Sequence, residues 1–149
     1  MNMRNALRGR RWLPAALALV LVAGLGGTAQ AAVTNITMDP TAQLSAGGLH
    51  ATLTGTVTCD PGDTPNLSGQ IVATKNEPGG FGSAHAVCDG TAQPYAIDVT
   101  TGGPFPFPGT ATGPFKAGKA TAQVSTSICD WWLMTCTTKY VDGEIKLLK

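Results

Sequence analysis

Hydrophobic and polar side chains alternate with a period of two through residues 49–59. One face of this segment would carry only apolar or small side chains, namely Leu49, Ala51, Leu53, Gly55, Val57 and Cys59. The other face would carry His50 and four threonines. Strict alternation of this kind is typical of a β strand with one face buried and one face in water. The pattern therefore predicts a strand over the whole segment.

Shorter segments of the same kind follow one another along the chain. We expect further strands at residues 33–38, 67–75, 81–88, 92–101, 120–128 and 137–148. Turn residues separate them, and frequent prolines leave few windows for a long helix. About seven strands predict an all-β domain, an antiparallel two-sheet sandwich with an immunoglobulin-like Greek key. A small closed β-barrel is the alternative.

The N-terminal segment has the features of an export signal. A basic region is followed by an apolar run at residues 13–25 that is too short to span a bilayer, and Ala29-Gln30-Ala31 forms a small-x-small cleavage site. Residues 1–31 are therefore interpreted as a removed signal peptide, with the Sec type favoured over the twin-arginine type. Residues 32–149 would form a single secreted domain. No second apolar segment follows, so we expect no transmembrane anchor.

Removal of the signal would also change the charge of the protein. The whole chain carries a formal charge of +1, but all four arginines lie in the signal. The remaining domain has six lysines and nine acidic residues, a net charge of −3. An acidic surface without arginine argues against binding of nucleic acid or of anionic lipid, and we expect a monomer.

Four cysteines in an exported chain predict two disulfides. Cys59 and Cys88 both fall on the inner faces of their predicted strands. Cys129 follows the inward-facing Ile128 and should point outward, so it cannot easily meet Cys59. Side-chain parity therefore predicts the pairs Cys59–Cys88 and Cys129–Cys136.

Residues that could support catalysis or metal binding lack the necessary partners in the sequence. His50 and His85 fall on faces predicted to be exposed, and neither has a second ligand at zinc spacing. No Gly-x-Ser-x-Gly motif is present. Asp60 and Asp63 flank a Pro-Gly turn, and Asp89 precedes a glycine, which are ordinary turn positions for aspartate. We therefore expect a protein without enzymatic activity, cofactor or metal.

Several short motifs carry a resemblance to known proteins. Together with a late cysteine pair, they are Cys59, Cys88-Asp89-Gly90-Thr91 and Phe115-Lys116-Ala117-Gly118-Lys119-Ala120-Thr121. In these the chain resembles small secreted actinobacterial proteins with an immunoglobulin-like β-sandwich, a resemblance that implies a fold and no activity. It is more faintly similar to apoproteins of the neocarzinostatin type. Those proteins have two disulfides that close short loops, whereas Cys59 and Cys88 lie far apart in this sequence.

The stretch between the last two cysteines is the strongest candidate for a contact surface. It would form the tip of a hairpin and holds four large apolar residues, and aromatic side chains of this kind dominate binding hot spots. We expect a secreted binding module that contacts an extracellular protein or small ligand there. The alternatives are a protease inhibitor, or a small-molecule carrier with a cleft between its sheets. The candidate residues are Trp131, Trp132, Leu133 and Met134, with Phe105 and Phe107 in a nearby loop.

Overall fold

The computed structural model describes residues 32–72, 78–102, 113–130 and 134–149, which form eight β strands. None of these residues is helical, so none belongs to an apolar helix long enough to cross a membrane. The all-β prediction is confirmed, whereas the predicted signal peptide lies outside the described residues. The strands are β1 (Val33–Ile36), β2 (Thr41–Leu44), β3 (His50–Cys59), β4 (Asn66–Val72), β5 (Gly80–His85), β6 (Gln93–Thr101), β7 (Gly118–Asp130) and β8 (Thr135–Leu148).

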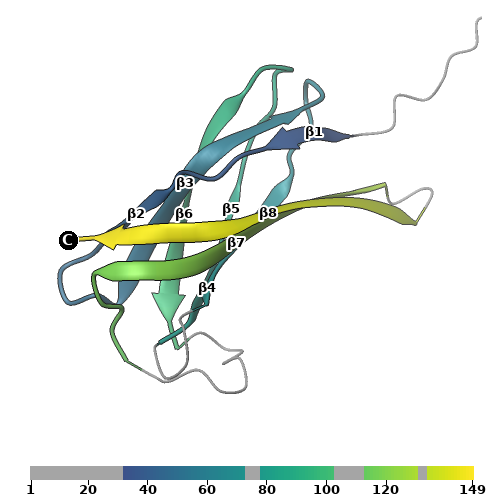
Figure 1. Cartoon of the computed structure of the whole chain (residues 1–149). Helices are drawn as coiled ribbons and strands as arrows, with labels where there is room; N and C mark the ends of the chain where they lie inside the picture. Colours follow the sequence, from purple (N-terminus) through teal and green to yellow (C-terminus); the bar gives the residue numbers. More distant parts are fainter. Residues whose placement is uncertain (1–31, 73–77, 103–112, 131–133) are drawn as a thin grey trace, which may run out of the picture.

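Seven of the strands form a closed circuit (Figure 1). Its order is β3-β2-β8-β7-β4-β5-β6, and β6 pairs again with β3. The predicted sandwich of two separate sheets is therefore wrong, and the alternative of a small closed barrel describes the fold. Within the circuit β7 returns to lie beside β4, which gives the spatial order β7-β4-β5-β6 of a Greek key.

Glycines explain why the barrel closes between β5 and β6. These strands pair only briefly, through Gly80 with Thr101 and Phe81 with Thr100. A Cβ atom added at Gly80 or at Gly82 would collide with a backbone carbonyl of β6. Because glycine has no Cβ, β6 can approach β5 closely enough to seal this side of the barrel.

On the other side of the barrel, β3 and β8 are joined by β2, a strand that was not predicted from the sequence. We expected one strand at residues 33–38, but the chain continues past Pro40 into β2. Both β1 and β2 pair with β3, and β2 also pairs in parallel with the end of β8. The backbone N–H of Lys146 donates to the carbonyl of Pro40 at 2.9 Å, which ties the two strands together. The described residues therefore form eight strands, where about seven were predicted for the whole domain.

The inner faces of the strands form one core, as their alternation predicts. Leu49 is an exception, because it precedes β3 in a turn and is 53% exposed. Many inward positions hold glycine or alanine, which suits the narrow interior of a small barrel. The largest fully buried aliphatic side chains are Leu53, Leu67, Ile71, Ile97, Ile145, Val33, Val57, Val99 and Val124.

Candidate functional site

Both predicted disulfides are present in the structure. Cys59 and Cys88 are buried, and their Cα atoms lie 5.5 Å apart. Cys129 and Cys136 are exposed and lie directly opposite each other on β7 and β8, with Cα atoms 4.0 Å apart. Parity therefore predicted both pairs correctly, including the outward orientation of Cys129.

The β7–β8 hairpin extends beyond the barrel as an arm (Figure 1). The pairing of β7 with β4 ends at Ser127, opposite Asn66. Residues 128–130 of β7 therefore pair only with residues 135–137 of β8. We call residues 128–130 and 134–137 the hairpin arm. It is joined to the barrel by the longer remainder of the same hairpin and by Ile128, which packs against the core.

Met134 lies at the far end of the hairpin arm. Its side chain is 93% exposed, and its φ of 51° is the only positive value at a non-glycine residue in the described part of the chain. Of the predicted contact residues, Met134 alone is described, while Trp131, Trp132, Leu133, Phe105 and Phe107 lie outside the described residues. The structure therefore places the end of the predicted surface on a projecting element.

His50 belongs to a small polar cluster on the outside of the barrel. Its Nδ1 atom lies 3.0 Å from Oδ2 of Asp98 and 3.3 Å from Oγ1 of Thr100. In a nucleophile–histidine–acid triad the acid and the nucleophile contact different ring nitrogens. Here both partners share one nitrogen, so the cluster is not such a triad. In the described part of the chain, no group of three or more potential ligand residues could hold a metal ion.

The aspartates predicted to lie in turns do lie in turns, and the side chain of Asp89 holds its turn through hydrogen bonds. The backbone N–H and the hydroxyl of Thr91 both donate to Oδ1 of Asp89, at 2.8 and 2.6 Å. The hydroxyl hydrogen bond is the main cause of a lowered pKa of Asp89. Asp63 donates its backbone N–H to the carbonyl of Asp60 at 3.1 Å. These contacts are those of local turn formation.

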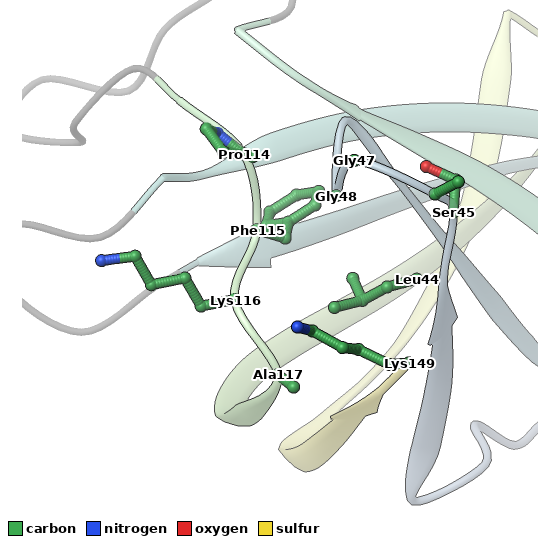
Figure 2. Close-up of a pocket in the computed structure, with 10 residues that line it drawn as sticks. Leu44, Ser45, Gly47, Gly48, Pro114, Phe115, Lys116, Ala117 and Lys149 are labelled. Carbon is green, nitrogen blue, oxygen red and sulfur yellow. The ribbon is translucent and has the colours of Figure 1, made fainter.

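A hollow at the opposite end of the hairpin escaped the sequence analysis (Figure 2). It has a volume of about 630 Å³ and is enclosed by three segments that are distant in sequence. These are the end of β2 with the turn that follows it, the segment before β7, and the residue after β8. Its lining residues are Leu44, Ser45, Ala46, Gly47, Gly48, Pro114, Phe115, Lys116, Ala117 and Lys149. The adjacent glycines Gly47 and Gly48 are typical of a turn, but the sequence does not show which segment packs against that turn.

No protein-family model, no curated protein and no solved structure matches the sequence or the fold. The resemblance to secreted immunoglobulin-like proteins therefore stays a prediction. Two features of the described residues are available for a functional proposal, the hairpin arm and the hollow.

Proposed function

We propose that the protein is a secreted, non-enzymatic binding module that contacts its partner through the tip of the hairpin arm. The observation that carries the proposal is the exposure of Met134 at the end of an element that projects from the barrel. An apolar side chain in this position contributes nothing to the core. Exposed apolar groups gathered at one place on a soluble protein typically mark a contact site.

The sequence adds to the apolar character of this tip. Trp131, Trp132 and Leu133 immediately precede Met134, and the whole stretch lies between the two cysteines of one disulfide. Tryptophan is the residue type most enriched in binding hot spots. A covalently closed loop loses less conformational freedom on binding than an open one, so more of its contact energy becomes affinity.

The disulfides fit a protein that works outside the cytoplasm. Such bonds form and persist in oxidising compartments, and both pairs join cysteines of the predicted mature domain. Together with the export signal in the sequence, they support secretion as part of the proposal. The partner that we propose is therefore an extracellular protein.

The test is to compare binding by the wild-type domain and by a variant with Trp131→Ala, Trp132→Ala and Met134→Ala. The immobilised domains are exposed to proteins from the culture medium and the cell envelope, and to a panel of secreted proteases. We expect the variant to lose a partner that the wild type binds, with affinity lower by about tenfold or more. If the tip contacts a partner as proposed, the melting temperature of the variant should change little.

A matched control replaces Gln123 by alanine on the exposed outer face of β7. This variant should retain the partner. The proposal fails if the triple variant melts at a much lower temperature and still binds the same partners, because its side chains would then be structural. Inhibition of a protease by the wild type alone would narrow the proposal to a protease inhibitor.

A further inference from the structure

The two disulfides of the domain differ in their access to solvent. Cys59 and Cys88 are only 1% and 3% exposed and belong to the core. Cys129 and Cys136 are exposed residues of the hairpin arm. Because a thiolate cleaves a disulfide by attacking one of its sulfur atoms, access decides which bond reacts. A reductant can therefore reach the Cys129–Cys136 bond in the folded domain, but it reaches Cys59–Cys88 only when the barrel opens.

The backbone around the exposed disulfide has little other support (Figure 1). β4 pairs with β7 no further than Ser127, and Ile128 is the last residue of β7 that packs against the core. Beyond Ile128, the last residues of β7 pair only with the first residues of β8. A two-stranded ribbon without further partners is marginally stable in water. Cleavage of the disulfide that cross-links this ribbon should therefore loosen the outer part of the hairpin arm.

The same geometry would allow the bond to form again. Cys129 and Cys136 lie directly opposite each other, with Cα atoms 4.0 Å apart. The pairs from Gly118–Leu147 to Ile128–Thr137 hold the two strands in this register without help from the disulfide. Two thiols kept close in one chain have a high effective concentration toward each other. The chain has four cysteines and all are in the two disulfides, so no further thiol competes.

We propose that Cys129–Cys136 is a reversible redox site, which a dithiol reductant cleaves and which controls the order of the hairpin arm. A thiolate of the reductant attacks the Sγ of one cysteine and breaks the S–S bond, and the other cysteine leaves as a thiolate that takes up a proton. The second thiolate of the reductant then attacks the mixed disulfide and releases the first cysteine as a thiol. The protein gains two electrons and two protons, and the reductant becomes a disulfide.

This redox site does not depend on the proposed function of the tip. Cleavage changes the order of the hairpin arm whether or not the tip contacts a partner protein. If the tip bound no protein, the disulfide would still be cleaved and formed again. If the disulfide resisted the reductant, the tip would still be available as a contact surface. The two proposals can therefore fail separately.

The experiment incubates the folded, oxidised domain with dithiothreitol at neutral pH without denaturant. Samples are treated with iodoacetamide at intervals, and peptide mapping by mass spectrometry identifies the alkylated cysteines. Cys129 and Cys136 should react at least about a thousandfold faster than Cys59 and Cys88, because the buried bond is open only in the rare unfolded state. Oxidised glutathione should then restore the bond. In ¹⁵N-labelled protein, the amide signals that shift on reduction and return on oxidation should be those of the hairpin arm.

The variant Cys129→Ser, Cys136→Ser imitates the reduced arm permanently. Its amide spectrum should resemble that of the reduced wild type in the hairpin arm and that of the oxidised wild type in the barrel. Dithiothreitol at the concentration that cleaves the wild-type bond should leave this variant unchanged, which shows that Cys59–Cys88 resists the reductant. Equal rates for the two disulfides, no alkylation of Cys129 without denaturant, failure of the bond to form again, or signals that shift throughout the barrel would each overturn the proposal.

Discussion

Tyr95 shows how one buried side chain links the edge of the barrel to its core. It lies on the inner face of β6, and its hydroxyl donates to the carbonyl of Thr37 at 2.5 Å. Room for its ring exists because the facing residue of β3 is Gly55, where a Cβ atom would meet both the ring and that same carbonyl. Burial, and to a smaller degree the charge of Asp39, raise the pKa of Tyr95 to about 12.

This raised pKa predicts a loss of stability in alkali. An unfolded tyrosine ionises near pH 10, so above that value the unfolded state releases a proton that the folded state retains. The free energy of unfolding should therefore be insensitive to this group below about pH 10 and should fall, by roughly 3 kcal/mol at most, as the pH approaches 12. Urea unfolding at a series of pH values measures the effect.

Two tyrosine variants make the assignment specific. Tyr95→Phe should lower the free energy of unfolding at neutral pH by about 1 kcal/mol through the lost hydrogen bond, and should reduce the decline in alkali. Tyr140→Phe, at an exposed position on β8, should keep the decline. An alkaline decline of equal size in both variants would contradict this role of Tyr95.

At the scale of elements, the seam between β5 and β6 is the most sensitive part of the barrel. Gly82→Ala should destabilise the fold by about 3 kcal/mol, the upper part of the range for overpacked interiors, because the new methyl group meets the backbone of Asp98 and not a flexible side chain. Chemical denaturation measures this change. It should appear as a shift in the midpoint with the same dependence on denaturant.

Gly143 provides a matched control for this prediction. It also lies within a strand, but a Cβ atom there would have only the Met38 side chain near it, at 3.9 Å. Gly143→Ala should be neutral or slightly stabilising, because alanine restricts the unfolded chain more than glycine does. If the two variants were equally stable, close approach at the β5–β6 seam could not be the reason for the glycine at position 82.

At the scale of the whole molecule, local patterns in the sequence predicted the strands but not their closure. Alternation identified the inner faces of β3, β6 and β7, because the direction of side chains along a strand depends only on neighbouring residues. Side-chain parity was sufficient for both disulfides. Closure of the barrel depends instead on which backbone lies opposite Gly80 and Gly82, which is a contact between distant segments.

The same distinction applies to the candidate sites. The hairpin tip was found from the sequence, since its cysteines and apolar residues are contiguous. The hollow was missed because its walls come from residues near 48, 115 and 149, which approach only once β2 and β8 are paired. Gly48 is the one local signal, and a glycine in a turn does not by itself indicate which segment it allows to approach.

The two disulfides should contribute unequally to the stability of the molecule. Cys59–Cys88 closes a separation of 29 residues and connects the end of β3 to the loop after β5, both in the core. Its removal should lower the free energy of unfolding by about 3.6 kcal/mol from loop entropy alone. Cys129–Cys136 closes a separation of 7 residues, for which the same relation gives about 2.4 kcal/mol as an upper value.

The Cys129–Cys136 disulfide should stabilise the barrel against unfolding by less than this upper value. β4 does not pair with β7 beyond Ser127, and Ile128 is the last residue of β7 that packs against the core, so the outer part of the hairpin arm can open with little effect on the rest of β7 and β8. Calorimetry should therefore show a large fall in melting temperature for Cys59→Ala, Cys88→Ala and a small one for Cys129→Ala, Cys136→Ala. Hydrogen exchange of the second variant should rise only in the hairpin arm. An equal fall in both variants would mean that the arm folds together with the barrel, and the tip would then be part of its stability as well as a surface for binding.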